Sequence, residues 1–170
     1  MNYFEFYAIP VQFHPDPQVV KQTFFSNSKK FHPDFYVSAS EEKQAEVLEM
    51  SSFNNKAFQT LKNEALLIPY VLEILGQLKA EEHYQLPQSF LMEMMDINEA
   101  LMDVQMDPNP EQLQAVKQQI ETFEINLQGA LNNLTKQYDA NPNDNQVLVE
   151  IKDLYFRNKY LMRLKAQLEK

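Results

Sequence analysis

The chain has 170 residues, a hydrophobic content of 44% and a formal net charge of -9, so it can form one ordinary domain or two small ones. The negative charge excludes sequence-independent binding to nucleic acid or anionic lipid by the molecule as a whole. Only 2 glycines occur, which favours a mostly helical protein because β-hairpins and phosphate-binding loops rely on glycine.

The first part of the chain predicts two helices. Residues 3–8 are expected to form a compact aromatic turn of helix that plugs a core. Asp16-Pro17 is typical of a helix start, with Asp as the N-cap and Pro in the first turn. This second helix is predicted to end near Phe31, and its inner face is expected to carry Val20, Phe24 and Phe31.

The next two helices are predicted at residues 41–62 and about 66–75. In the first of them, apolar residues recur at helical spacing as Val47, Met50, Phe53, Ala57 and Leu61. Asn54 interrupts this face, and the pattern gives no reason for a polar residue there. Gly76 follows the second helix and fits a C-cap.

The second half of the chain predicts a helical bundle. Residues 77–87 are interpreted as a linker, which divides the chain into domains at residues 1–76 and 88–170. Long amphipathic helices are expected at about 89–105, 111–138 and 145–168. Because short breaker strings separate them, they favour an antiparallel three-helix bundle. The predicted fold class is therefore all-α.

The chain has no cysteine, so it cannot form disulfides or ligate zinc or an iron–sulfur cluster through thiolates. The N-terminal residues lack the pattern of a signal or transit peptide. The longest apolar stretch, residues 65–76, is interrupted by Pro69 and Glu73 and is far short of a membrane span. We therefore expect a cytoplasmic protein that uses no metal or cofactor and binds neither membrane nor nucleic acid.

The tripeptide His-Pro-Asp occurs at residues 14–16 and again at residues 32–34. Pro33 fixes its own φ and biases His32 away from the helical region, so the preceding helix must end there. Asp34 is expected to bond to nearby backbone amides and to hold the loop rigid. A rigid polar loop at the tip of two antiparallel helices is typical of a docking site. The first copy is explained more simply, as a helix cap.

The helix that precedes the second tripeptide has a basic face. Its charged residues are Lys21, Lys29 and Lys30, with no acidic residue among them. This face contrasts with the charge of the whole chain and leads toward His32. A solvated surface is the alternative interpretation, since lysines near a helix C-terminus are also favoured by the macrodipole.

The helix expected at residues 89–105 carries two apolar stripes. The core stripe consists of Phe90, Met94, Ile97, Leu101 and Val104. The second stripe, which a three-helix bundle need not bury, consists of Leu91, Met95, Met102 and Met106. Its neighbours are Met92, Asp96, Glu99 and Asp103. Pliable methionines beside acids indicate an adaptable protein-binding surface, although packing on the first domain or on the last bundle helix explains the stripe equally well.

On the last helix, Phe156 is the candidate for the same protein-binding surface. The core face of that helix is predicted to contain Val147, Ile151, Leu154, Leu161 and Leu168. Phe156 lies away from this face, so it is either an interdomain contact or part of the Met-rich surface.

The order of these features resembles a J-domain over residues 1 to about 75. A short first helix and a basic second helix are followed by His32-Pro33-Asp34 and by a third helix with Ala57-Phe58-Gln59-Thr60-Leu61. The second half resembles the HscB-type co-chaperones of iron–sulfur cluster assembly, because Phe90-Leu91-Met92-Glu93 opens an acidic, Met-rich helix of a three-helix bundle. The resemblance then covers nearly the whole chain.

This resemblance implies a J-domain that stimulates the ATPase of a DnaK-like chaperone, usually HscA, and a C-terminal domain that binds the cluster scaffold IscU. The residues of this chain that it implies contact the ATPase are His32, Pro33, Asp34, Lys21, Lys29 and Lys30. The residues of this chain that it implies bind the scaffold are Leu91, Met92, Met95, Asp96, Glu99 and Phe156. Asn54 departs from the family, which usually has an aliphatic residue there.

Three other interpretations compete with this one. A catalytic dyad of His32 and Asp34 has no visible nucleophile, and side chains on either side of a proline are expected to point apart. A metal site from the three histidines at positions 14, 32 and 83 lacks ligand spacing. A helical adaptor that binds a partner through the Met-rich surface is the serious alternative, and it predicts that His32 is dispensable.

Overall fold

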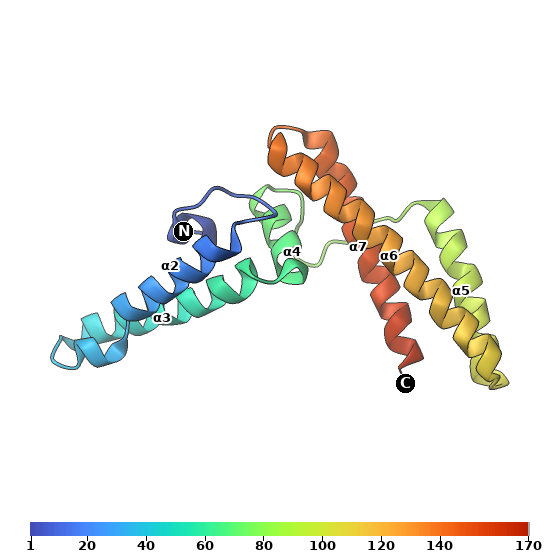
Figure 1. Ribbon diagram of the computed structural model, residues 1–170, viewed down its shortest axis with the longest axis horizontal. Coiled ribbons are helices and arrows are strands. Elements are labelled where there is room, and N and C mark those ends of the chain that lie inside the picture. Colours follow the sequence, from blue (N-terminus) through green and yellow to red (C-terminus); the bar gives the residue numbers. More distant parts are fainter. Residues whose placement is uncertain (170) are drawn as a thin grey trace. The chain divides into compact units, whose positions relative to one another are not determined.

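The computed structural model describes residues 1–169, which contain helices and no β-strand. This confirms the all-α prediction. The chain divides into two compact units, one at Met1–Leu75 and one that begins at Gly76 (Figure 1).

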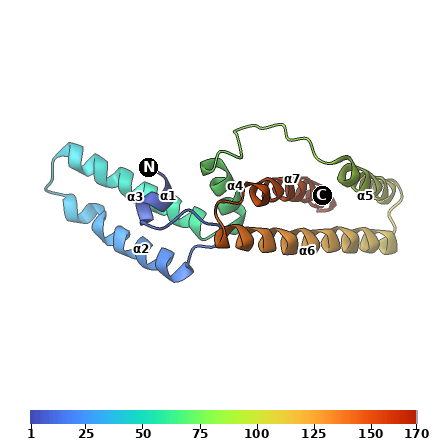
Figure 2. The same cartoon turned by 90° about the horizontal axis from the view of Figure 1, so that it is seen from above.

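The first unit is a helical hairpin with short flanking helices. Its elements are α1 (Tyr3–Tyr7), α2 (Pro17–Lys30), the short 3-10 helix η1 (Pro33–Tyr36), α3 (Glu41–Leu61) and α4 (Glu64–Ile74). Helices α2 and α3 lie side by side in both views, and η1 lies in the connection at one end of the pair (Figures 1 and 2). The hairpin therefore presents the second His-Pro-Asp tripeptide at its tip.

Local sequence explains where the hairpin helices begin. The Asp16 carboxylate accepts a hydrogen bond from the Gln18 amide at 2.9 Å, with Pro17 at the first helical position. This confirms the cap predicted from the first tripeptide. Ser40 caps α3 in the same way, since its hydroxyl accepts from the Lys43 amide at 3.2 Å.

The core of the first unit confirms most of the apolar pattern. Phe4 and Tyr7 of α1 are buried, as expected for an aromatic plug. The fully buried part of the predicted faces consists of Val20, Val47, Ala57 and Leu61, whereas Phe24, Phe31, Met50 and Phe53 are half-buried. Gly76 follows α4 with φ of 73°, the left-handed conformation expected after a helix end.

Asn54 is a buried polar residue with several partners. Its side chain is 1% exposed and its amide nitrogen donates to the Phe24 carbonyl and to the Ser28 hydroxyl, each at 3.2 Å. Its side-chain oxygen accepts from the Tyr7 hydroxyl at 2.8 Å. The interruption of the apolar face is thus explained, because Asn54 connects α1, α2 and α3.

The second unit is a bundle of α5 (Gln88–Met106), α6 (Pro110–Ala140) and α7 (Asn145–Leu168). Helices α6 and α7 run alongside each other in both views, and α5 packs on them (Figures 1 and 2). The core shared by the three helices contains Phe90, Met94, Ile97, Leu101, Val116, Ile120, Leu161 and Leu164. The predicted core stripe of α5 is confirmed by the burial of its first four members.

The predicted core face of α7 is partly wrong. Leu154 is only half-buried, whereas Leu148 and Leu164, which were not predicted, are buried at 3% exposure each. Leu168 is half-buried and packs against the shared core, as predicted. The buried surface of α7 meets α6 as well as α5, so it is wider than one stripe of the helix.

The segment interpreted as a linker contains no helix, but its second half is fixed on α7. Lys152 forms an ion pair with Glu82 at 2.8 Å, and the Tyr84 hydroxyl donates to the Asp153 carboxylate at 2.7 Å. Because α7 lies in the second unit, residues 82–86 belong structurally to that unit.

Candidate functional site

His32 and Asp34 form a small turn at the tip of the hairpin. His32 is the N-cap of η1, and its imidazole Nδ1 accepts a hydrogen bond from the Asp34 amide at 3.3 Å. An accepting Nδ1 places the imidazole proton on Nε2. The side chains of His32 and Asp34 are 52% and 84% exposed, so both are presented to solvent.

This geometry corrects two expectations. The imidazole, not the Asp34 carboxylate, accepts the backbone hydrogen bond that fixes the turn, because His32 occupies the capping position. The side chains on either side of Pro33 also do not point apart, since His32 Nδ1 lies 3.7 Å from an Asp34 oxygen. Both groups are nevertheless open to water, which does not favour a catalytic dyad.

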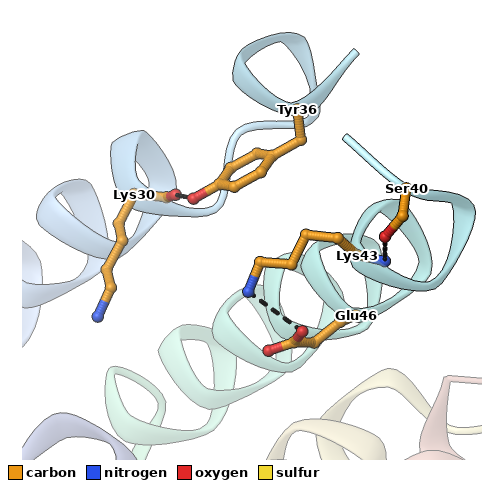
Figure 3. Close-up of polar contacts among 5 residues, drawn as sticks. All are labelled: Lys30, Tyr36, Ser40, Lys43 and Glu46. Atoms are coloured by element: carbon orange, nitrogen blue, oxygen red, sulfur yellow. Dashed lines mark hydrogen bonds and ion pairs between the residues drawn. The ribbon is translucent and has the colours of Figure 1, made fainter. Parts of the chain in front are cut away.

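The loop is held by longer-range hydrogen bonds. The Tyr36 hydroxyl donates to the Lys30 carbonyl at 2.8 Å and so ties η1 to the last turn of α2 (Figure 3). Gln44 of α3 donates to the carbonyls of Val37 and Ala39, each at 3.0 Å. The second tripeptide is therefore rigid because both helices of the hairpin hold its connection.

The three lysines of the basic face are exposed on α2. None of them forms an ion pair with an acidic residue in the described part of the chain, although the Lys30 ammonium lies 5.2 Å from the Phe31 ring centroid. By contrast, Lys43 on α3 pairs with Glu46 at 3.1 Å (Figure 3). The positive charge of Lys21, Lys29 and Lys30 is thus available to an external partner.

An exposed apolar group beside the tripeptide was not predicted from the sequence. Phe35, Val37 and Leu48 are 74%, 73% and 62% exposed. Val37 and Leu48 line a cavity of about 500 Å³ together with Pro33 and Asp34. The only sequence signal is the Phe35-Tyr36-Val37 run, and three residues in a short turn are too few for periodicity to show which of them are exposed.

The Met-rich surface of α5 is exposed within the structure. Its methionines at positions 92, 95, 102 and 106 are 60%, 66%, 61% and 83% exposed. Leu91 is half-buried, and Asp96 and Glu99 are exposed beside it. The structure thus places five of the six predicted scaffold residues along one helix.

Phe156, the sixth residue, comes from α7 and is half-buried. Its ring stacks on Tyr84 with centroids 4.5 Å apart and an interplanar angle of 7°. The neighbouring Tyr160 contacts α5, because its hydroxyl accepts from the Asn98 amide group at 3.2 Å and its ring meets Phe90 edge-on. The stacking partner of Phe156 was not predicted, since Tyr84 lies in the segment interpreted as a linker.

Two further findings concern metal and membrane. Within residues 1–169, no group of three or more His, Asp or Glu side chains is arranged to hold a metal ion. Among the described helices, none combines the length and the apolar character that crossing a membrane requires.

Comparison with known proteins identifies the second unit and the overall architecture. Residues 86–169 match the HSCB C-terminal oligomerisation domain. A co-chaperone protein HscB homolog of Vibrio cholerae is 36% identical over 112 residues, which are 65% of this chain and 66% of that protein. The homolog of Vibrio campbellii is 32% identical over the same shares of the two chains. The matched region therefore spans slightly less than two thirds of these relatives.

Solved structures agree over a longer range. The chaperone HscB from Vibrio cholerae superimposes with a TM-score of 0.67 at 27% identity, covering 99% of this chain and 96% of its own. The human co-chaperone protein HscB gives a TM-score of 0.73 over 99% and 81% of the two chains, and at 18% identity it supports the fold alone.

A hairpin that presents His32-Pro33-Asp34, followed by this bundle, defines a J-domain protein with an HSCB-type C-terminal domain. The chain belongs to the HscB family of co-chaperones.

Proposed function

We propose that this protein is a co-chaperone for iron–sulfur cluster assembly. Its first unit stimulates ATP hydrolysis by a DnaK/HscA-type chaperone, and its second unit binds an IscU-type scaffold. The observation that carries this proposal is the second His-Pro-Asp tripeptide, which the hairpin presents rigidly beside an unpaired basic helix face.

The first unit supports docking on the chaperone in three ways. His32 uses Nδ1 internally and so leaves its Nε2–H as a donor for the ATPase. Lys21, Lys29 and Lys30 attract an acidic surface and raise the association rate. The exposed Phe35 adds an apolar contact next to the tripeptide.

The second unit supports scaffold binding through exposed apolar side chains that its own core does not use. Met92 and Met95 are flexible and can adapt to a partner surface, and Asp96 and Glu99 add charge selectivity. Phe156 contributes an aromatic side chain, a residue type enriched in interfaces. The serious alternative, an adaptor that uses only this surface, gives no role to the presented tripeptide.

The proposal assigns no chemical step to this chain, since ATP hydrolysis occurs on the chaperone. The absence of cysteine fits a reducing compartment, and we propose the cytoplasm. The test is the steady-state ATPase rate of an HscA-type chaperone with increasing amounts of this protein, with and without scaffold. A rate that does not rise in either series contradicts the proposed function.

A further inference from the structure

A cavity of about 450 Å³ lies between residues 82–86 and α7. Aromatic side chains from both sides line it, and they are Tyr84, Phe156 and Tyr160. Its remaining wall includes the basic side chains of Lys159 and Arg163 and the His83 imidazole. One acid, Glu82, also lines it and is paired with Lys152. The site is thus an aromatic cavity with a basic edge in a chain whose net charge is -9.

Several contacts fix the side chains that line the cavity. Tyr84 stacks on Phe156, and its hydroxyl donates to Asp153 at 2.7 Å. Burial and this hydrogen bond raise the pKa of Tyr84 to about 12, so the hydroxyl stays protonated and donates even at alkaline pH. The Lys152–Glu82 pair fixes the start of the same segment. A preformed aromatic cavity binds a ligand with little ordering cost.

The basic residues of α7 fall into two groups. Lys152, Arg157 and Lys165 each have a carboxylate partner, at 2.8, 2.7 and 2.9 Å. Lys159 and Arg163, which line the cavity, form no ion pair with any described residue. The two unpaired cations are four residues apart, so they lie on the same side of the helix. Their charge is available to an anion that enters the cavity.

The cavity adjoins the Met-rich surface of α5. Tyr160 lines the cavity and accepts a hydrogen bond from Asn98 at 3.2 Å. Asn98 is half-buried and lies three residues after Met95 and four before Met102, which places it beside the exposed methionine stripe. A partner seated on that stripe therefore reaches the cavity across Tyr160.

We propose that the cavity receives an acidic segment of the same scaffold, with carboxylates at Lys159 and Arg163 and an apolar side chain against Phe156. This inference rests on the proposed scaffold binding and extends it. The surface that binds the scaffold is then negatively charged along α5 and positively charged at the cavity. A partner must carry basic residues for the first part and an acidic segment for the second, which gives specificity by charge pattern.

The test is titration of an IscU-type scaffold with full-length protein carrying Lys159→Glu and Arg163→Glu together. The control carries Lys117→Glu and Lys136→Glu, which change the net charge equally but lie on α6 outside the cavity. The cavity variant is expected to bind about fivefold more weakly than the control, because partly exposed charge pairs each contribute modestly. Its scaffold affinity is also expected to depend less on salt.

Equal affinity of the two variants overturns the cavity proposal while leaving scaffold binding in place. If the unmodified protein binds no scaffold, the proposed function fails instead, so the two failures are distinguishable. A thermal melt of each variant verifies folding. Should the cavity variant melt early, Lys159→Gln with Arg163→Gln serves as a milder replacement, and equal binding by that variant also overturns the proposal.

Discussion

The Tyr7 hydroxyl donates a 2.8 Å hydrogen bond to the side-chain oxygen of Asn54 in the buried core of the first unit. The bond spans 47 positions of the sequence and joins α1 to the middle of α3. It therefore helps to hold the short N-terminal helix against the hairpin that presents the tripeptide.

Asn54→Leu is expected to destabilise the first unit by about 1–3 kcal/mol, because the Phe24 carbonyl and the Ser28 hydroxyl lose a donor. The Tyr7 hydroxyl loses its 2.8 Å acceptor and keeps only the longer 3.3 Å contact with the backbone carbonyl of residue 54. The double variant Asn54→Leu with Tyr7→Phe is expected to recover part of this loss, since both polar groups are then removed. Urea unfolding of the full-length variants measures the difference. A double variant that is less stable than Asn54→Leu alone would show that the pair is not the cause.

Sequence periodicity predicted the order of the helices because apolar spacing and capping residues are local signals. Asn54 was not explained, since its partners at Tyr7, Phe24 and Ser28 are distant in sequence and meet only in the fold. Tyr84 was missed for the same reason. A segment without helical pattern indicates a linker, yet a ring stack and two polar contacts fix it on α7.

The candidate site likewise has features that the sequence predicts and features that only the fold reveals. The tripeptide and the methionine stripe were predictable, because one depends on proline geometry and the other on helical spacing. The capping role of His32 in place of Asp34 was not predictable, since either of the two polar side chains that flank Pro33 can cap the turn. Whether these residues contact a chaperone stays a prediction.

The Met-rich surface is tested by the triple variant Leu91→Ala, Met92→Ala and Met95→Ala. Each truncation is expected to cost on the order of 1–2 kcal/mol of scaffold binding if it is an anchor, or about tenfold in affinity per 1.4 kcal/mol. Calorimetric titration measures the affinity. The matched control is Ile125→Ala with Val149→Ala, which removes exposed apolar groups from α6 and α7.

Phe156→Ala is expected to behave differently from that triple variant. It removes the stacking partner of Tyr84, so it should lower the melting temperature as well as scaffold affinity.

If the triple variant also melts early, Leu91, Met92 and Met95 are structural. Unchanged affinity in a well-folded triple variant would exclude the surface as the scaffold site.

Alkaline pH tests the Tyr84–Asp153 hydrogen bond. The pKa of Tyr84 is raised to about 12, chiefly by burial, whereas an unfolded tyrosine titrates near 10. The stabilisation is therefore complete below about pH 10 and is lost as the pH rises toward 12. The free energy of unfolding should fall as the pH rises from about 10 toward 12, and Tyr84→Phe should make that fall shallower. Identical slopes for the two proteins would contradict this assignment.

The basic face of α2 predicts salt-dependent association with the chaperone. Because the screening length is about 8 Å at physiological ionic strength, the association rate should fall as salt increases. Lys29→Glu with Lys30→Glu should remove most of this dependence. The Lys117→Glu, Lys136→Glu protein, with the same net charge, should retain it. Stopped-flow association rates at several salt concentrations test this prediction. A salt-independent rate for the unmodified protein would rule out an electrostatic role of the basic face in association.

The central claim is that His32, and not His14, acts on the chaperone. It is tested most directly by the steady-state ATPase rate of an HscA-type chaperone with unmodified, His14→Gln and His32→Gln proteins, each with scaffold present. We expect His32→Gln to lose the stimulation while its melting temperature stays unchanged, and His14→Gln to stimulate fully because Asp16 provides the helix cap at the first tripeptide. Full stimulation by His32→Gln, or its loss in a folded His14→Gln protein alone, would contradict the account.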